Sequence, residues 1–431
     1  MKFLYADTQD YVDPGYDFIE DRNAPGRKRY WDDMYAHEIM SHAPYDGLLV
    51  SMSAIRQAEG VVASKVRYKT SEEQRFLRNG ARKFLRFSGP KFSKAMLMGD
   101  CGAFAYVEHE LPAYAPTEVV DFYDEAGFTH GVSPDHIIFD CDLTNPPSTA
   151  IDFATIDRYE ITLENALKFY KLTQKQDFPF EPMGAVQGWS PKSMAASAKK
   201  LVKMGYKYLA IGGLVPLKVT AIHEVLLHIR KQVPIDINIH LLGFAKADHI
   251  HQFLDYGITS FDSTSPFIKA FKDQKTNYYL PKKDGGLDYY AAIRIPQAIE
   301  NARLVRGMKK GLFDPVVLLR KEKIALDSVR SLDAGTISGD SVLQAVMDYH
   351  QFLIRGEGDT LENQENDLKK TEFLVARTIK DMPWKHCDCD ICRKVGVEVI
   401  IFRSSNRNKR RGFHNLHVYH QHLQNTMSNR K

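Results

Sequence analysis

A regular alternation of short apolar segments and longer helical segments across residues 183–262 limits the fold of this chain more than any other feature. The predicted strands are MGAVQ (183–187), KYLAIGG (207–213), INIHLLG (237–243) and ITSFD (258–262). The first helix between them is opened by Ser190 and Pro191 and ends before Gly205, which is the usual punctuation of a helix. Short apolar strands joined by helical crossovers predict a parallel sheet.

Three further strands are predicted upstream, at GLLVSMS (47–53), KAMLMGD (94–100) and DHIIFD (135–140). An eighth strand, either KFLYA at residues 2–6 or a segment within 60–68, would close a (β/α)8 TIM barrel of the α/β class. A doubly wound open sheet is the alternative, but no G-x-G-x-x-G motif follows any of the strands.

Several predicted strands end in residues that suit a catalytic site. These residues are Asp100, Asp140, Gln187, Gly212, Gly213, Leu242 and Asp262. Barrel enzymes place their active sites at the C-terminal ends of the strands. A single aspartate there more often caps the next helix, but three aspartates together with a glutamine favour a site. Because no histidine is predicted at these ends, the expected chemistry is that of two carboxylates at a sugar, one as nucleophile and one as acid/base.

Three of the five cysteines lie within six residues, as Cys387, Cys389 and Cys392. This C-x-C-x2-C spacing requires a fourth ligand for tetrahedral zinc. The competing histidines are His414, His417, His420 and His422. A redox dithiol is the weaker alternative, because it has no use for a third thiol. Zinc with a filled coordination sphere would be structural and would do no chemistry.

The composition is that of an ordinary folded protein, with 44% hydrophobic and 26% charged residues. Neither a signal peptide nor an apolar run of about 18 residues is found, so we expect a cytoplasmic protein with no membrane partner. The net charge of +4 is too small to indicate a binding partner. A basic run at 402–423 suits phosphate contacts or is a solvated surface, and the chain beyond Leu423 is expected to fray.

We expect three parts along the chain. Residues 1–285 would form the catalytic barrel and residues 384–431 a zinc-binding subdomain with a basic C-terminal tail. Between them, residues 286–383 would form a helical insertion with amphipathic helices in 290–330 and 338–380. The insertion would build either a second lobe around the zinc site or a platform for nucleic acid.

The strand ends resemble those of a known family, the tRNA-guanine transglycosylases. MGDCGAF is similar to the family's T-D-S-G-G-[FY], IIFDCD to F-D-E-C, AVQGWS to V-Q-G and YLAIGGL to Y-A-I-G-G-L. HLLGFAKADHI is similar to Y-L-M-G-x-G-x-P-E-D-L, and GITSFDSTSP to G-I-D-M-F-D-C-V-x-P. The C-terminal CDCDIC and HNLHVY resemble the family's zinc site, which implies His414 as the fourth ligand. The matches keep their order across about residues 95–265 and 384–423, and their joint occurrence is specific.

The resemblance implies a base exchange at a nucleoside. Asp262 would attack C1′ of a guanosine, expel guanine and form a covalent glycosyl-enzyme, which a 7-deazaguanine base then displaces with overall retention. Asp100 would act as the general acid/base on the leaving and entering bases. The zinc would be structural, and no redox or nucleotide cofactor is expected.

The resemblance also implies how guanine is recognised. Asp140 would accept from N1–H and N2–H, and Gln187 and the backbone at Gly212 and Gly213 would face O6, because an unpaired buried polar group costs about 1–3 kcal/mol. The ring would lie between Phe104 and Leu242. From the sequence alone, core packing is the simpler expectation for Phe104.

Departures from the family pattern resemble the DNA-modifying branch, the DNA-guanine transglycosylases. Cys101 and Ala103 replace the usual Ser and Gly without removing the carboxylate of Asp100. The T-R-S-G-R segment with which tRNA-modifying members read their substrate does not follow Asp262, and ADTQDYVDPGYDF resembles the D-[ST]-Q-D-x-V-D-P segment of the DNA branch. Lys218 stands where bacterial members have a glutamate for an aminomethyl base, so a neutral nitrile base is expected.

We therefore predict a pentosyltransferase that exchanges guanine in DNA for 7-cyano-7-deazaguanine (preQ0). The target base must leave the duplex stack, and accessory proteins of a modification system are expected partners. Candidate phosphate contacts are Lys269, Lys272, Lys282 and Lys283. The alternatives are a tRNA-guanine transglycosylase and a non-catalytic, zinc-stapled nucleic-acid-binding protein.

Overall fold

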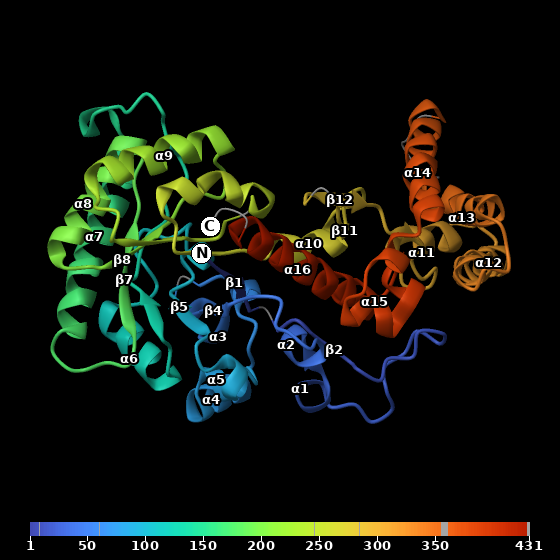
Figure 1. Cartoon of the computed structure of the whole chain (residues 1–431), viewed down its shortest axis with the longest axis horizontal. Coiled ribbons are helices and arrows are strands. Elements are labelled where there is room, and N and C mark those ends of the chain that lie inside the picture. Colours follow the sequence, from blue (N-terminus) through green and yellow to red (C-terminus); the bar gives the residue numbers. More distant parts are fainter. Residues whose placement is uncertain (8, 60, 245, 284, 355–360, 429–431) are drawn as a thin grey trace. The chain divides into compact units, whose positions relative to one another are not determined.

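The computed structural model describes residues 1–7, 9–59, 61–244, 246–283, 285–354 and 361–428. The chain forms two compact units, which are coloured along the sequence in Figure 1. The first unit comprises Met1–Gln9 and Tyr45–Ser265, and the second comprises Asp10–Pro44 and Pro266–Lys431. This division differs from the three predicted parts, 1–285, 286–383 and 384–431, because residues 10–44 and everything after Ser265 pack into one unit.

Eight parallel strands close into a barrel in the first unit. In chain order they are β1 (Lys2–Ala6), β4 (Gly47–Ser51), β5 (Met96–Asp100), β6 (His130–Val132), β7 (Glu181–Val186), β8 (Tyr208–Ile211), β9 (Asn238–Leu241) and β10 (Ser260–Asp262). β1 pairs with both β10 and β4, so the N-terminal strand closes the barrel. The predicted TIM-like barrel is confirmed, with KFLYA as its eighth strand. The alternative segment, 60–68, contains only the 3-10 turn η1 (Ala63–Lys65) among its described residues.

The interior of the barrel is a packed core. The buried residues that fill it are Leu4, Leu49, Met96, Met98, Val132, Met183, Ala185, Tyr208 and Ala210. Pairs such as Met96 with Met98 and Met183 with Ala185 are two positions apart, because alternate side chains of a strand point to the same side. The inward set therefore forms the core, while the residues that follow each strand are left at the barrel's C-terminal end.

The predicted strand at 135–140 is wrong. The sixth strand is His130–Val132, and the chain then runs as coil through Asp140. The amide of Ser133 still donates to Met183 O at 2.9 Å, but Pro134 has no N–H to continue the ladder. Side chains take over the next amides: His136 N donates to Thr162 Oγ1 and Ile138 N to Gln187 Oε1.

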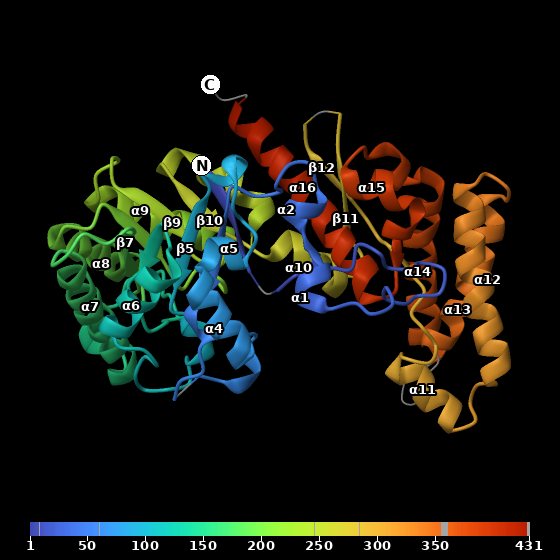
Figure 2. The same cartoon turned by 90° about the horizontal axis from the view of Figure 1, so that it is seen from below.

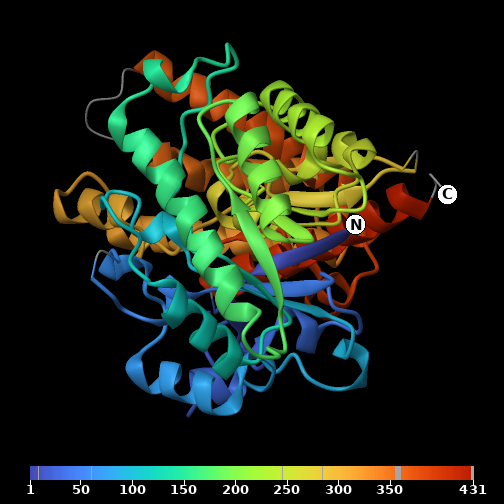
Figure 3. The ribbon, with the colours of Figure 1, turned by 90° about the vertical axis from the view of Figure 1, so that its left-hand side faces the viewer.

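Helices lie outside the barrel strands, as Figure 3 shows for the green segments. The α-helices of this unit are α3 (Met52–Ile55), α4 (Thr70–Asn79), α5 (Ala81–Phe84), α6 (Pro116–Ala126), α7 (Phe153–Thr173), α8 (Pro191–Met204) and α9 (Val219–Gln232). The 3-10 segments after η1 are η2 (Pro90–Phe92), η3 (Ala103–Ala105), η4 (Ser148–Ala150) and η5 (Ala247–Tyr256). Ser190 caps α8 by accepting from Ser193 N, and Gly205 ends it in the left-handed region, so the predicted punctuation is confirmed.

The second unit combines small strand pairs with a helical region. Its first part contains β2 (Tyr11–Val12), α1 (Arg29–Asp32), β3 (Met34–Tyr35) and α2 (Ala36–Ile39). The chain returns at α10 (Ser265–Lys272), the hairpin β11 (Tyr278–Pro281) and β12 (Leu287–Tyr290), and β13 (Ile293–Arg294), which pairs with β14 (Ile401–Phe402). Lys282 and Lys283 follow β11 and are exposed, whereas Lys269 of α10 lies over the rings of Tyr279 and Tyr289.

The predicted insertion contains helices, but they begin later than residue 290, because the segment first forms the strands β12 and β13. Its helices are α11 (Ala302–Lys309), α12 (Pro315–Asp333), α13 (Gly339–Ile354) and α14 (Leu361–Asp381), and residues 355–360 of the predicted helix 338–380 lie outside the described residues. α13 packs between α12 and α14, as Figure 2 shows. The cysteine segment follows as η6 (Pro383–His386), α15 (Asp390–Val395) and η7 (Gly396–Val399), and the chain ends with α16 (Ser405–Ser428). None of the helices in the described part of the chain is long and apolar enough to cross a membrane.

The basic run at 402–423 is not a solvated surface. Arg407, Arg410 and Arg411 of α16 are at most 1% exposed. Arg407 pairs with Asp21 and Glu398, and Arg411 donates to backbone carbonyl groups, including Val399 O at 3.1 Å. Burying these guanidinium groups requires such partners, because an unpaired buried charge is strongly unfavourable. The arginines therefore hold α16 inside its unit and are not available to phosphates.

The prediction of a frayed terminus beyond Leu423 is wrong as far as Ser428, where α16 ends. The last residues of the predicted basic tail, 429–431, lie outside the described residues.

Candidate active site and metal centre

Asp262 ends β10 and is held by two hydrogen bonds to the same oxygen. Gly243 N donates to Asp262 Oδ1 at 2.8 Å, and His240 Nε2 lies 3.1 Å from that atom. The residue is only 5% exposed, so it is more enclosed than an open barrel mouth predicts. No described residue donates a hydrogen bond to its other oxygen, Oδ2. One oxygen is thus anchored and the other is left for chemistry.

His240 is a site residue that the sequence analysis missed. It lies on β9, is fully buried, and belongs to a chain of polar groups inside the barrel. Its Nδ1 lies 2.7 Å from Ser260 Oγ, which lies 2.6 Å from the hydroxyl of Tyr208. Burial raises the pKa of Tyr208, so its hydroxyl stays protonated and donates towards Ser260. With Asp262 ionised, the chain runs Tyr208 to Ser260 to His240 to Asp262, and His240 carries its proton on Nε2.

The signal for His240 was present in the sequence. HLLG has histidine where the resembled pattern has tyrosine, in Y-L-M-G. The expectation concerned histidines at the strand ends, and His240 lies within β9. It nevertheless reaches the carboxylate at the end of the neighbouring β10, because it points inward and β9 pairs with β10 at His240 and Ser260.

Asp100 ends β5 and carries an unusual protonation equilibrium. Its Oδ1 is buried and has no hydrogen-bond partner among the described residues. Burial, with smaller contributions from the charges of Asp262 and Asp135, raises the pKa of Asp100 to about 7, although Ser51 and the Gly102 amide favour the ionised form. The carboxyl group is thus able to release and accept a proton near neutral pH.

Asp135 is the second residue that the sequence analysis missed. It is 5% exposed and accepts from Gln187 Nε2 at 2.7 Å and from the Cys101 thiol at 3.2 Å. Burial raises the pKa of the Asp135 carboxyl group, and the hydrogen bonds from Gln187 and Cys101 oppose that rise. The predicted carboxylate, Asp140, instead lies in exposed coil and makes no hydrogen bond or ion pair with any described residue. Pro134 ends the strand and so brings Asp135, not Asp140, next to the barrel core.

Gln187 links this coil to the end of β8. Its Oε1 accepts from Ile138 N at 3.2 Å, so Gln187 holds the segment that leads to Asp140. A Cβ atom on Gly212 would lie 2.1 Å from Gln187 Nε2, and one on Gly213 would lie 2.6 Å from Ile138 O. Gly213 also has a φ of +70°, which disfavours any side chain. The two glycines are therefore required for the close approach of the two segments.

The two residues predicted to enclose a ring differ in burial. Phe104 of η3 is 48% exposed, so the expectation that it packs in the core is wrong. Its ring lies 5.4 Å from that of Phe139, and its Cε2 is 4.0 Å from the place of a Cβ on Gly243. Phe104 is thus near the loop that anchors Asp262. Leu242 follows β9 and packs partly buried against the barrel core.

The predicted metal ligands come together in the second unit. Cys387, Cys389, Cys392 and His414 place their ligand atoms within 4.8 Å of one another. His414 Nδ1 lies 3.5, 3.4 and 3.3 Å from the three sulfur atoms in that order. Zinc bonded tetrahedrally to sulfur at about 2.3 Å and to nitrogen at about 2.0 Å separates these atoms by roughly 3.5 Å. The cluster therefore has the composition and spacing of a metal site.

Neighbouring groups orient the histidine of this cluster. His414 Nε2 donates to Tyr279 O at 2.7 Å, which leaves Nδ1 facing the sulfur atoms. The ring of Tyr278 stacks on His414 with centroids 4.0 Å apart. His417, His420 and His422 are not part of the cluster found in the described residues. The structure thus agrees with the histidine that the family resemblance selected.

Comparison with known proteins decides the family. Residues 51–281 match the family described as Queuine tRNA-ribosyltransferase. The chain is 38% identical to the DNA-guanine transglycosylase of Salmonella montevideo over 429 residues, which cover 99% of this chain and 98% of that protein. The chain belongs to the transglycosylase family. The predicted resemblance, including that to the DNA-modifying branch, is confirmed, and with it a base-exchange glycosyltransferase activity.

A more distant relative is similar to only part of this transglycosylase. The tRNA-guanine(15) transglycosylase of Methanocaldococcus jannaschii is 24% identical over 234 residues, which cover 52% of this chain and 34% of that protein.

The protonation of Asp100 predicts a pH-dependent stability. Its pKa in the folded protein, about 7, lies above the ordinary value of 3.8, so the fold favours the neutral form. This contribution is complete below about pH 4 and is lost as the pH rises through 7. Asp100→Asn, which stays neutral, should be more stable than the wild type above pH 7 by up to about 4 kcal/mol, and similar to it at pH 4.

Denaturant unfolding between pH 4 and 8 measures this difference. Asp121→Asn, which changes an exposed carboxylate on α6, serves as the matched control. Parallel curves for the wild type and Asp100→Asn would contradict the prediction.

Proposed function

We propose that the protein is a DNA-guanine transglycosylase that exchanges guanine in DNA for 7-cyano-7-deazaguanine through a covalent aspartyl intermediate. The observation that carries the proposal is the similarity, over nearly the full length of both chains, to a protein named DNA-guanine transglycosylase. The anchored carboxylate of Asp262, with the proton-exchanging carboxyl group of Asp100 close enough to feel its charge, supports the mechanism.

In the first half of the reaction, Asp262 Oδ2 attacks C1′ of the target deoxyguanosine. The bond between C1′ and N9 breaks, its electron pair leaves with the base, and Asp100 in its neutral form supplies the proton that makes guanine a neutral leaving group. In the second half, Asp100 removes a proton from the entering base, whose nitrogen attacks C1′ and expels the carboxylate of Asp262. Two displacements at the same carbon give retention.

His240 acts as a positioning residue in this mechanism. By donating to Oδ1 of Asp262, His240 and the Gly243 amide direct Oδ2 towards C1′ and stabilise the carboxylate when it is expelled again. Because Ser260 occupies Nδ1, the imidazole ring cannot turn away without breaking a second buried hydrogen bond.

The base is recognised at the ends of β6 to β9. Asp140, whose exposed carboxylate has no partner among the described residues, accepts from guanine N1–H and N2–H. Gln187 positions this segment through Ile138 and Asp135, and its second amide proton and the Gly213 amide, next to Gly212, face O6. Phe104 and Leu242 enclose the ring. Lys218, exposed at the start of α9, favours the neutral nitrile base over an aminomethyl cation.

The cluster of Cys387, Cys389, Cys392 and His414 binds zinc, because three thiolates and one imidazole suit this ion and fill its coordination sphere. The ion joins the cysteine segment to α16 and takes no part in the reaction. We place this reaction in the cytoplasm. A DNA substrate requires the target base to flip out of the duplex, at a cost of a few kcal/mol. Accessory proteins would help with this step.

A tRNA substrate is the second candidate, and the partial similarity to a tRNA-guanine(15) transglycosylase favours it. The missing T-R-S-G-R after Asp262 is evidence against it.

The covalent mechanism predicts that Asp262→Asn loses base exchange and forms no adduct with nucleic acid. The protein is incubated with labelled guanine or labelled 7-cyano-7-deazaguanine and either duplex DNA or tRNA, and the labelled polymer is identified. We expect label in DNA with the wild type and with the control Asp121→Asn, and none with Asp262→Asn. Label in tRNA alone would exclude the DNA proposal, and an adduct formed by Asp262→Asn would exclude the covalent role.

The positioning role predicts a graded effect of His240 substitutions. His240→Phe removes the donor to Asp262 and should lower kcat by about 10- to 100-fold, as expected for a buried hydrogen bond of about 1–3 kcal/mol. The KM for the nucleic acid should change little, because the lost donor acts on the attacking carboxylate and not on substrate binding. His240→Tyr, which restores a donor, should recover part of kcat. Equal losses of kcat in His240→Phe and His240→Tyr would leave His240 a purely structural role.

The zinc assignment predicts that Cys389→Ser loses bound metal and yields less folded protein, because binding of the ion contributes to folding. Metal analysis of the purified wild type should find about one zinc ion per chain. Cys141→Ser changes a half-buried cysteine outside the cluster and should keep the metal. Normal folding of Cys389→Ser with full metal content would contradict the assignment.

A further inference from the structure

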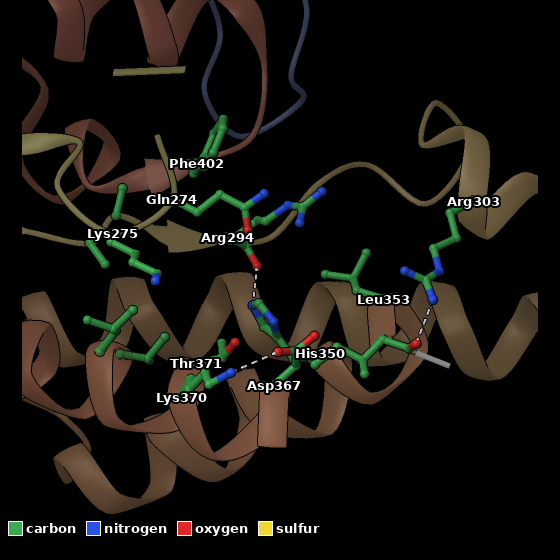
Figure 4. Close-up of a pocket in the computed structure, with 15 residues that line it drawn as sticks. Gln274, Lys275, Arg294, Arg303, His350, Leu353, Asp367, Lys370, Thr371 and Phe402 are labelled. Carbon is green, nitrogen blue, oxygen red and sulfur yellow. Dashed lines mark hydrogen bonds and ion pairs between the residues drawn. The ribbon is translucent and has the colours of Figure 1, made fainter. Parts of the chain in front are cut away.

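A basic cavity lies in the second unit, and none of the four candidate metal ligands is among its described lining residues. Its volume is about 390 Å³, and it is bounded by β13, by the segment after α10 and by helices α13 and α14 (Figure 4). Among the residues that the structure describes, four cationic side chains line it, and Asp367 is the one carboxylate. The cations are Lys275, Arg294, Arg303 and Lys370. Gln274 and Thr371 add neutral polar groups to the same walls.

Arg294 is the central residue of this cavity. Its guanidinium group makes no hydrogen bond or ion pair with any residue that the structure describes. Burial lowers the pKa of Arg294, and the positive charge of Arg303 lowers it further. A partly buried cation without a counter-ion is unfavourable, and a second cation beside it adds to the cost. The arrangement is what an anion would stabilise.

The backbone fixes Arg294 in this place. His350 Nε2 of α13 donates to Arg294 O at 2.7 Å, which ties β13 to the helix that forms the opposite wall (Figure 4). Burial lowers the pKa of His350 to about 4, so His350 is a neutral donor near pH 7 and adds no charge. Because β13 also pairs with β14, the arginine projects from an anchored strand.

The other charges of the cavity do not neutralise Arg294. Asp367 Oδ1 lies 3.6 Å from Lys370 Nζ one turn along α14, so the single carboxylate already has a cation. Arg303 donates to the carbonyl oxygen of Ile354 at 2.6 Å, which is a neutral acceptor. Lys275 is exposed at the rim. Among the described lining residues, the cationic side chains thus outnumber the carboxylates, and none of these carboxylates pairs with Arg294.

We propose that this cavity binds a phosphate group, and that the group is a backbone phosphate of the DNA substrate. Arginine forks bind phosphate oxygens in pairs, and lysine adds a point charge, so two arginines and two lysines suit a tetrahedral anion. The volume lies at the small end of ligand cavities, which range over about 300–1,000 Å³, and accommodates a phosphate with its flanking sugar. The choice of DNA as the source rests on the proposed function, since a free phosphate or a nucleotide has the same chemistry.

Because the arginines of α16 are buried, the phosphate contacts of the substrate must be made by other cations. The basic run that the sequence offers for phosphate contacts is used inside the fold, through pairs such as Arg407 with Asp21 and Arg403 with Glu322. The cavity cations instead come from the helical insertion and the segments that lead to it, which have no role in the barrel chemistry. The insertion is thus assigned a contact with the substrate backbone.

Two measurements on the full-length, metal-loaded protein test the proposal. The first is thermal unfolding with and without inorganic phosphate at constant ionic strength, since a ligand that binds only the folded state raises its stability. The second is the affinity for duplex DNA as a function of salt concentration. Each lost phosphate contact should reduce the slope of log K against log salt by about one.

Arg294→Gln removes the central charge and keeps polar groups in the cavity. We expect phosphate to raise the unfolding temperature of the wild type but not of Arg294→Gln, and we expect the DNA salt slope to fall by about one in the variant. Lys370→Gln should show the same changes in smaller degree and replaces the first variant if that fails to fold. Lys323→Gln, an exposed position on α12 outside the cavity, should leave both measurements at wild-type values.

Each contrary result has a separate meaning. Phosphate stabilisation that depends on Arg294, with an unchanged DNA salt slope, would overturn DNA as the source and leave a free phosphate or nucleotide. Equal behaviour of the wild type, Arg294→Gln and Lys370→Gln in both measurements would overturn the site. A wild type that labels only tRNA would refute the proposed DNA function without altering the phosphate result, so the two failures are distinguishable.

Discussion

Closure of the barrel by its N-terminal strand is the constraint on which the site depends. β1 pairs on one side with β10, where Leu4 is opposite Asp262, and on the other side with β4. β4 in turn pairs with β5, where Ser51 is opposite Asp100. Two carboxylates that are far apart in the sequence thus end strands separated by only two others. Without the five residues of β1, the first and last parts of the barrel have no hydrogen-bonded connection.

The site buries two carboxyl groups, and the fold supplies them with different numbers of hydrogen-bond donors. Asp262 is enclosed but receives two donors at one oxygen, and the other ring nitrogen of His240 is hydrogen-bonded to Ser260, which in turn bonds to Tyr208. Asp100 has an orphaned oxygen, and its neutral form is favoured by burial and by neighbouring negative charge. This difference supports the proposed roles, because a carboxylate held by two donors suits a nucleophile and a carboxyl group whose neutral form is favoured suits proton transfer.

The same principle separates two groups of cations in the second unit. The arginines of α16 are buried with carboxylates and carbonyl groups, so they act as internal supports. Arg294 lies in a cavity without such partners among the described residues, so it remains available to an external anion. Local charge density does not distinguish these cases, because both groups are runs or clusters of positive residues. Their partners come from distant segments, such as Asp21 for Arg407.

The sequence by itself determined the barrel, the strand ends with Asp100, Gln187 and Asp262, and the three cysteines of the metal cluster, because strand and helix periodicity and ligand spacing are local properties. His414 was selected from four histidines by the family resemblance and not by spacing. Only the tertiary structure decided that Asp135 and not Asp140 is buried beside Asp100. Pro134 ends the hydrogen bonding of β6, and Gln187 then holds the following coil through hydrogen bonds to Asp135 and Ile138. The tertiary structure also decided that His240 reaches Asp262 from the next strand, and that the basic C-terminal run is internal. Each of these depends on contacts between segments far apart in the chain, and no local pattern encodes which groups will meet there.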